Sequence, residues 1–317
     1  MGEHGASNGD RDLARLLRLA GRRVDVDPVR AARVERAVRS AWRAHRARRG
    51  LRLRLAAIGL AAAVLIAIAA SWPRTPAVAA TVELARGATV SGRVLARGDA
   101  VAVGETVNSA GGRVALRLAN GLSLRLDHDS VLRFTGDGAE LTAGAAYIDH
   151  LGDGAGLALR TPFGAIVQHG TQYEARIDDA GLSLRVREGA IALTCDAGEF
   201  PATAGERVSL ADPAGAIVRG TIAADDPAWD WAGECAHAPA LDGATLADAL
   251  TWLCRERGWK LAYDAGLAER AASTRLHGLP ADLSPRDALD YLLPPCGLAA
   301  SNAGGRLAIT LPTENAP

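Results

Sequence analysis

The residues best suited to covalent chemistry are Gly170 and Thr171. A threonine hydroxyl can attack the carbonyl carbon of the residue before it, and glycine permits the strained backbone that such an attack needs. His169 stands directly before the pair and could aid proton transfer. The alternative is a tight turn between strands, in which the glycine is needed only for its backbone.

Two other segments contain residue types that occur at metal and phosphate sites. Asp127-His128-Asp129 offers potential metal ligands, but adjacent polar residues in a turn after a strand usually face water. The stretch Gly136–Gly156 lacks the lysine and the strand-to-helix context of a phosphate loop, so we interpret it as turns. We therefore expect no metal, no cofactor and no enzyme activity beyond a single-turnover self-cleavage at Gly170-Thr171.

Residues 81–222 are expected to form the scaffold for these segments. Short alternating apolar and polar runs recur there at intervals of about ten residues, separated by Gly, Asn or Asp. Asn120-Gly121, between the runs Arg113–Leu118 and Ser123–Leu126, is a strong hairpin signal. The pattern predicts an all-β domain, and the even spacing suits either a sandwich or a β-solenoid.

Residues 241–312 follow a linker at 225–240 and alternate between helix and strand patterns. Thr245 caps one apolar-faced helix, and Ser284-Pro285 opens a second. Strands are expected at Trp259–Tyr263, at Arg275–Gly278 and in a closing hairpin around Gly304-Gly305. We therefore expect a small α+β domain.

The linker and the cysteines leave alternatives open. Trp229 and Trp231 either pin the β domain to the C-terminal domain or form an exposed patch for a partner. Four cysteines allow three disulfide pairings or free buried thiols, and no CxxC spacing favours a metal site. They are Cys195, Cys235, Cys254 and Cys296.

The N-terminal part differs in charge from the rest of the chain. Residues 1–54 carry 15 Arg against 6 acidic residues, whereas residues 73–317 carry 21 basic and 30 acidic residues. Leu55–Trp72 is an uncharged run of 18 residues, about 27 Å long as a helix and close to the roughly 30 Å hydrocarbon core of a bilayer. The arginine flank predicts one transmembrane helix with the N-terminus in the cytoplasm.

A cleaved signal peptide is the alternative to a membrane anchor. Residues 77–79 (AVA) fit the small-residue cleavage pattern. However, 54 residues precede the apolar run, far more than an ordinary n-region, and they have helical patterns. We therefore favour an uncleaved anchor.

Two short helices are expected before the membrane segment. The second begins with Asp27 as its N-cap and carries an apolar stripe that includes Val34, Val38 and Trp42, with arginines on its other faces. Helices this short cannot bury such stripes alone, so we expect these three residues to bind a protein partner or to lie on membrane lipid. No fold signature supports direct nucleic-acid binding.

A series of ordered motifs in the β segment resembles the FecR family. They are RTPFG at 160–164, VQHGT at 167–171, YEAR at 173–176, VREG at 186–189 and AGE at 204–206, with an upstream hairpin at 119–126. The resemblance covers about residues 82–210. The C-terminal segment is similar to the short signalling domain of secretins and TonB-dependent receptors, through the helices at 246–250 and 285–289.

The resemblance implies a single-pass signal transducer in the inner membrane of a double-membraned bacterium. Its periplasmic part would sense an outer-membrane TonB-dependent receptor, and its N-terminal part would regulate a sigma factor of the extracytoplasmic-function class. Some members of the family are cleaved at the matching Gly-Thr bond by an N-to-O acyl shift, which implies the same chemistry for Gly170-Thr171.

The expected organisation has five segments: a cytoplasmic helical segment at 1–54, a transmembrane helix at 55–72, a periplasmic β domain at 73–224, a linker at 225–240 and an α+β domain at 241–317. Family N-terminal modules are commonly longer and contain several tryptophan motifs, whereas this one has Trp42 alone. The alternative is therefore a membrane-tethered periplasmic module that binds an envelope component or protein without regulating a sigma factor.

Overall fold

The computed structural model describes residues 15–19, 21, 27–30, 32–40, 42, 77–150, 156–236, 238–280 and 283–312. The chain divides into two compact units, residues 1–75 and 76–317, which are described separately. None of the described helices is long and apolar enough to cross a membrane. The predicted span Leu55–Trp72 lies outside the described residues.

The first unit contains short helical stretches among its described residues. Residues 15–19, 28–30, 32–40 and 42 are helical. The Asp27 side chain accepts a hydrogen bond from the Val29 amide at 3.0 Å, as predicted for an N-cap. A short helical N-terminus is thus confirmed.

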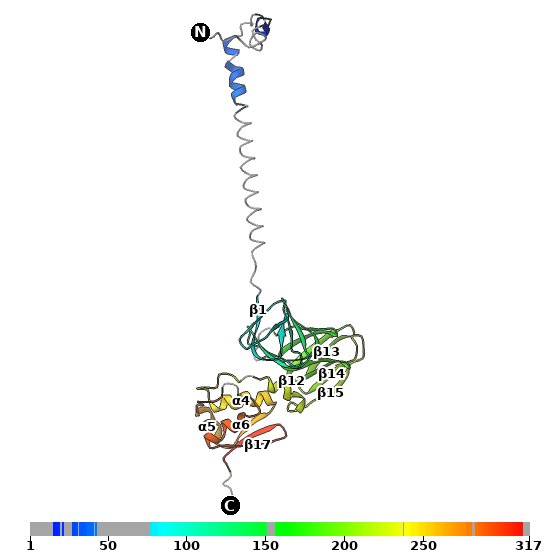
Figure 1. The fold of residues 1–317 in the computed structure, drawn as a ribbon, viewed down its shortest axis with the longest axis vertical. Coiled ribbons are helices and arrows are strands. Elements are labelled where there is room, and N and C mark those ends of the chain that lie inside the picture. The colour runs from blue at the N-terminus through cyan, green and yellow to red at the C-terminus, as the bar shows by residue number, and fades with distance from the viewer. Residues whose placement is uncertain are drawn as a thin grey trace, which may run out of the picture. The chain divides into compact units, whose positions relative to one another are not determined.

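The second unit begins with a 15-stranded sheet (Figure 1). Its strands are β1 (Val78–Arg86), β2 (Thr89–Val90), β3 (Arg93–Val94), β4 (Ala100–Ala102), β5 (Thr106–Asn108), β6 (Arg113–Leu118), β7 (Ser123–Leu126), β8 (Val131–Thr135), β9 (Gly138–Asp149), β10 (Leu159–Thr161), β11 (Gly164–Asp178), β12 (Gly181–Cys195), β13 (Gly198–Thr203), β14 (Glu206–Leu210) and β15 (Val218–Thr221). The strands do not form a clear solenoid. The prediction of a mostly β region is confirmed, and β6 and β7 pair around Asn120-Gly121 as predicted.

Three long strands organise this sheet because each pairs with different neighbours along its length. β9 pairs with β8 through its first half and with β7 and β11 through its second half. β11 pairs with β10 and then with β9, while β12 follows β11 for its whole length. These changes of partner curve the sheet around a single apolar interior.

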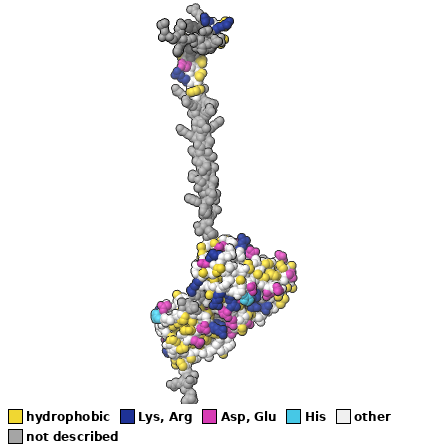
Figure 2. All heavy atoms as spheres, in the orientation of Figure 1, with side chains coloured by type: hydrophobic (Ala, Val, Ile, Leu, Met, Phe, Trp, Pro, Cys, Tyr) yellow, Lys and Arg dark blue, Asp and Glu magenta, His cyan; other side chains and the backbone are white. Residues whose placement is uncertain are grey.

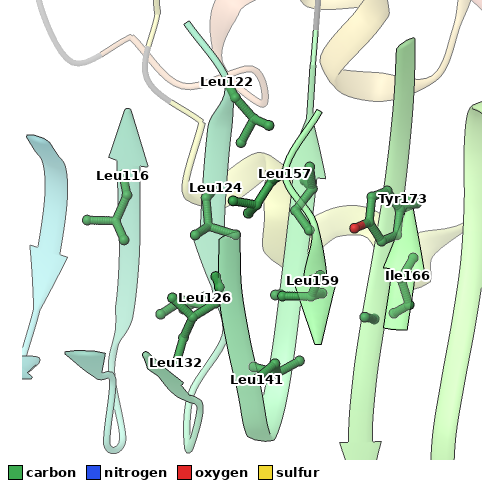
Figure 3. Packing of buried hydrophobic residues seen from close by; sticks show 14 of the residues in the cluster. Leu116, Leu122, Leu124, Leu126, Leu132, Leu141, Leu157, Leu159, Ile166 and Tyr173 are labelled. Carbon is green, nitrogen blue, oxygen red and sulfur yellow. The ribbon is translucent and has the colours of Figure 1, made fainter. Parts of the chain in front are cut away.

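The interior is lined by the alternate side chains of those strands. Leu124, Leu159 and Tyr173, from three different strands, are fully buried there and point toward one another (Figure 3). A strand that alternates in this way presents its other residues on the opposite face. On β7 and β9 that opposite face is buried too, so the sheet is covered on both sides here.

The stretch Gly136–Gly156, which was interpreted as turns, contains the long strand β9, and that interpretation is wrong. Small residues are tolerated in this strand because its outer face lies beneath tryptophan side chains. Ala145 and Tyr147 of β9 pack there with Trp229 and Trp231 in a second apolar cluster.

The linker forms the cover over this face. It contains a 3₁₀ turn, η1 (Pro227–Trp229), and a short helix, α3 (Asp230–Glu234). Both indoles lie edge-on to the Tyr147 ring, with centroids 6.0 and 6.4 Å away. Trp229 and Trp231 are therefore pinning residues, and the alternative of an exposed patch is wrong because both are buried.

The C-terminal region is a small α+β structure, as predicted. It contains α4 (Leu246–Arg257), β16 (Lys260–Tyr263), α5 (Leu267–Ser273), α6 (Ala288–Leu292), η2 (Pro294–Cys296), β17 (Ala299–Ala303) and β18 (Arg306–Thr310). The strands form one sheet in the order β16-β18-β17. The predicted strand at Arg275–Gly278 is wrong, because Arg275 makes only an isolated bridge with Thr245.

We predict that Trp229→Ala lowers the free energy of unfolding by about 3–5 kcal/mol, since the indole is fully buried and its Nε1 donates to the Ala223 carbonyl at 2.9 Å. Urea denaturation of the full chain, followed by circular dichroism, measures the change. Trp42→Ala is the control: this side chain is 65% exposed, and its loss should change the value by less than about 0.5 kcal/mol. Equal effects of both substitutions would contradict the packing described for η1.

Candidate functional site

Gly170 and Thr171 lie at an irregularity in the pairing of β11 with β12. His169 pairs with Ala190 and Gln172 pairs with Glu188, so more residues of β11 than of β12 lie between the two pairs. Gly170 has a φ of +55°, in the left-handed region that favours glycine. The two residues therefore form a β-bulge in the middle of a long hairpin.

Gly189, the last residue of the VREG motif, lies directly against this bulge. A Cβ atom added to Gly189 would lie 2.4 Å from the Gly170 carbonyl oxygen and 3.0 Å from Thr171 Oγ1. Gly189 also has a φ of +77°. The glycines of two separate sequence motifs are thus in direct contact, and a side chain at position 189 would displace the Gly170 carbonyl.

Thr171 is buried and held from two neighbouring strands. Its Oγ1 donates to the Ala190 carbonyl at 2.8 Å, and its own carbonyl accepts from the His150 amide at 3.2 Å. His150 is buried beside it, and its Nδ1 has no hydrogen-bond partner within the described part of the chain. The main chain of His150, directly after β9, thus faces the Thr171 carbonyl.

From sequence alone, His169 was the candidate for proton transfer, and nothing in the sequence pointed to His150. His169 occupies a position in β11 beside Gly170, but its side chain is not described. Gln168, also buried near the bulge, has both side-chain polar atoms without partners among the described residues. The bulge therefore adjoins buried polar groups that could bind water or exchange protons.

The Asp127-His128-Asp129 segment does not face water as a whole, and that expectation is wrong for Asp127. The Asp127 carboxylate is buried and accepts from Arg113 Nε at 2.9 Å and from Arg176 Nη2 at 2.8 Å. Burial alone would raise the pKa of Asp127, but these two arginines outweigh it and hold the pKa below its usual range. Both carboxylate oxygens of Asp127, the atoms that could bind a metal ion, therefore accept hydrogen bonds from arginines instead.

The contacts between the outer sheet face and the segments α3 and α4 are called the junction below. Figure 2 shows basic and acidic side chains side by side in this part of the molecule. Its central pair is Arg125 of β7 and Glu256 of α4, in which two guanidinium nitrogens donate to the carboxylate at 2.6 and 2.7 Å. Only 3% and 6% of these side chains are exposed, so the pair is a buried, bidentate salt bridge.

Burial alone would lower the pKa of Arg125, but the adjacent Glu256 carboxylate outweighs it and holds the pKa above its usual range. The guanidinium also lies over the Tyr147 ring, 5.4 Å from its centroid, and donates to the Ala232 carbonyl of α3 at 2.9 Å. Burial raises the pKa of Tyr147 to about 12. Arg125 therefore stays charged at physiological pH and joins three elements.

Two further arginines extend the junction toward the bulge. Arg187 of β12 donates to the Glu256 carbonyl at 2.9 Å and to the Ala224 carbonyl at 2.6 Å. Arg255 of α4 donates to Asp149 of β9 and to Glu188 of β12, both at 2.5 Å. Burial alone would lower the pKa of Arg255, but these carboxylates outweigh it and raise the pKa above its usual range.

A cavity of about 520 Å³ opens beside the junction. Its lining includes Glu83, Arg117, Trp252 and the segment 238–240. Arg117 donates to Glu83 at 2.9 Å, and the other arginines of the lining, at 125 and 255, are paired as described above. The charges of this lining are therefore balanced.

The sequence-predicted partner residues lie in the other unit. Val34, Val38 and Trp42 are 58%, 59% and 65% exposed on the N-terminal helix, at i, i+4 and i+8. Such spacing places them on one face of the helix. The structure thus does not bring them together with Gly170 and Thr171 within one compact unit.

All four cysteines are free thiols in this structure. Burial raises the pKa of Cys235 to about 11 and that of Cys254 to about 11. Thiols with such pKa values are almost fully protonated at neutral pH and are poor nucleophiles. The described residues contain no group of three or more His, Cys, Asp or Glu side chains placed to hold a metal ion.

Comparison with known proteins connects this region to one family. Residues 105–192 match the family model described as FecR protein. Two crystal structures, at 1.65 and 2.50 Å, of a "putative anti-sigma factor from Parabacteroides distasonis ATCC 8503" match with 14% identity and TM-scores of 0.34. The matches cover 67% and 71% of this chain and 99% and 100% of those chains. No curated protein matches at a significant level.

We predict that Gly189→Ala destabilises the fold by about 1–3 kcal/mol more than Gly205→Ala does, because only position 189 is crowded. Both glycines have similar positive φ values, +77° and +85°, so each substitution carries the same backbone penalty of about 1–2 kcal/mol. A Cβ on Gly205 would lie 3.9 Å from its nearest neighbour. Urea denaturation of the two variants measures the difference, and equal losses would contradict the contact between Gly189 and Gly170.

Proposed function

Since this chain belongs to the FecR family through its residues 105–192, we propose that it regulates a sigma factor. The family match within the β region is the observation that carries this proposal. The regulated factor would be of the extracytoplasmic-function class. It would bind the Arg-rich N-terminal segment on the cytoplasmic side of the inner membrane.

The exposed stripe on the N-terminal helix supports this assignment. Val34, Val38 and Trp42 present apolar surface in a segment that is otherwise rich in charge. A helix with one apolar stripe is a common means of binding a groove on a partner protein. Membrane lipid is the other surface that such a stripe could contact.

The charge asymmetry supports the proposed topology. The uncharged run at 55–72 is flanked on its N-terminal side by 10 arginines between positions 30 and 54. By the positive-inside rule, the arginine-rich side lies in the cytoplasm and the β region lies in the periplasm. In that arrangement the C-terminal α+β part would face the signalling domain of an outer-membrane TonB-dependent receptor.

Co-purification of the membrane-extracted full chain with sigma factors tests the proposal. We predict that Val38→Glu lowers sigma-factor retention at least about tenfold, because it places a charge in the apolar stripe. Ser40→Glu is the matched control: it adds the same charge to an exposed position of the same helix, off the stripe, and should retain the factor. Failure of the wild-type chain to retain any sigma factor would favour a membrane-tethered periplasmic binding module instead.

Self-cleavage at Gly170-Thr171 is a second candidate function, which the geometry of the bulge favours. Gly170 has a left-handed backbone, Thr171 is buried, and His150, whose Nδ1 has no partner among the described residues, directly follows the facing strand β9. These are a backbone conformation that only glycine adopts readily, a nucleophile held in place and a candidate proton acceptor. His150 takes the role that the sequence analysis considered for His169.

The reaction balances with water as the only co-reactant. Thr171 Oγ1 forms a bond to the Gly170 carbonyl carbon while its proton passes to a base, for which His150 is the candidate. The peptide C–N bond then breaks, and the Thr171 nitrogen takes up a proton. The product is an ester, which water hydrolyses to a Gly170 carboxylate and a free Thr171 N-terminus.

We predict two fragments, residues 1–170 and 171–317, on a denaturing gel of the full chain. Denaturation is needed because β11 is paired on both sides and the sheet holds the fragments together. Thr171→Ala should abolish cleavage, Thr171→Ser should retain it, and hydroxylamine should accelerate it by attacking the ester. Thr142→Ala, which also removes a hydroxyl that bonds a main-chain carbonyl, is the control and should cleave normally. A wild-type chain that stays intact under these conditions would exclude the reaction.

A further inference from the structure

The acidic partners of Arg255 lie in one row across three strands, and the bulge lies next to that row. Asp149 of β9 pairs with Gln172 of β11, and Gln172 pairs with Glu188 of β12. Arg255 reaches over this row, with Nη2 bonded to Asp149 and Nη1 bonded to Glu188. One guanidinium from α4 therefore ties together the two strands that enclose β11.

Each acid precedes a residue that contacts the Gly170-Thr171 pair. Asp149 is followed by His150, whose amide donates to the Thr171 carbonyl. Glu188 is followed by Gly189, which packs against the Gly170 carbonyl oxygen. A displacement of either acid toward or away from Arg255 would therefore move a direct neighbour of the scissile bond.

Arg255 with its two partners, Asp149 and Glu188, is called the clamp below. Most of the clamp is shielded from solvent. The side chains of Asp149 and Arg255 are 7% and 18% exposed, and Gln172 between the acids is buried. Glu188, at the other end, is 55% exposed. Shielded, charge-assisted hydrogen bonds hold geometry more firmly than exposed ion pairs do.

We propose that Arg255 is a positioning residue for the Gly170-Thr171 bond, through which the docked C-terminal α+β part holds the bulge in its observed geometry. The bridge between β9 and β12 keeps β11 from relaxing into regular pairing. Withdrawal of α4 from the sheet would release both strands at once. The consequence for cleavage rests on the self-cleavage proposed above, whereas the effect on the bulge does not.

This role needs the two terminal nitrogens of the Arg255 guanidinium. Two different nitrogens serve two different carboxylates on separate strands. A lysine has a single ammonium and cannot reproduce this planar geometry. Arg255→Lys should therefore keep the charge and lose most of the positioning.

Arg257→Gln is the matched control for Arg255→Gln. Arg257 belongs to the same turn of α4 and also forms an ion pair, with Asp230 of α3 at 3.2 Å, but that pair lies away from the row beside the bulge. Both substitutions remove one positive charge from α4. A general weakening of the junction would appear in both variants, and loss of the clamp would appear only at position 255.

Two measurements on the full chain test the proposal. The first is hydrogen exchange of the peptide that covers residues 168–174, in a Thr171→Ala background so that every chain is intact. We expect Arg255→Gln to accelerate exchange there about tenfold and Arg257→Gln to leave it unchanged, since the removed bonds are charge-assisted. Equal exchange in the two variants would overturn the proposal.

The second measurement is the rate of appearance of the 171–317 fragment in chains that retain Thr171. Arg255→Gln should slow it at least about fivefold relative to Arg257→Gln, under conditions in which both variants are fully folded, with little rescue by Arg255→Lys. A wild-type rate in Arg255→Gln would overturn the proposal. If the wild-type chain shows no cleavage, the self-cleavage fails as a function, and the exchange measurement alone decides whether Arg255 holds the bulge.

Discussion

The structure of the second unit depends on the buried salt bridge between Arg125 and Glu256. The outer face of β7 and β12 carries arginines where most sheets would present either apolar side chains or water-facing ones. A buried arginine without a partner is strongly unfavourable, so this face requires a cover that supplies acceptors. Glu256 of α4 and the Ala232 carbonyl of α3 supply them, which explains why the linker and the C-terminal part pack onto the sheet.

A junction built this way has different properties from an apolar one. Truncation of one partner in a buried ion pair costs about 3–5 kcal/mol, because the other charge is left without compensation. Apolar contact contributes specificity and area through Tyr147, Trp229 and Trp231. The tryptophans belong to the linker, so the apolar part of the cover lies in η1 and at the start of α3, whereas Arg255 and Glu256 of α4 supply charged groups.

Local features of this fold could be predicted from sequence because their causes are local. The hairpin at Asn120-Gly121 and the cap at Thr245 depend on residues within a few positions of each other. The bulge itself could not be predicted in this way, because the extra residue in β11 is defined only by its pairing with β12. Gly170 and Thr171 were identified, but their contact with Gly189 required the pairing of β11 with β12.

The clamp on the bulge could not be predicted in the same way. Arg255 is separated by 106 positions from Asp149 and by 67 from Glu188, and nothing in the helix pattern of α4 distinguishes Arg255 from Arg257. The segment that contains Asp149 was interpreted as turns, and its glycines and alanines lack the β-branched side chains that mark a strand. Its strand character comes instead from tertiary packing, since small residues on the outer face make room for the indoles. The covering tryptophans thus permit a small-residue strand. That strand presents Asp149 to Arg255 of α4, and the residue after it, His150, donates its amide to the Thr171 carbonyl.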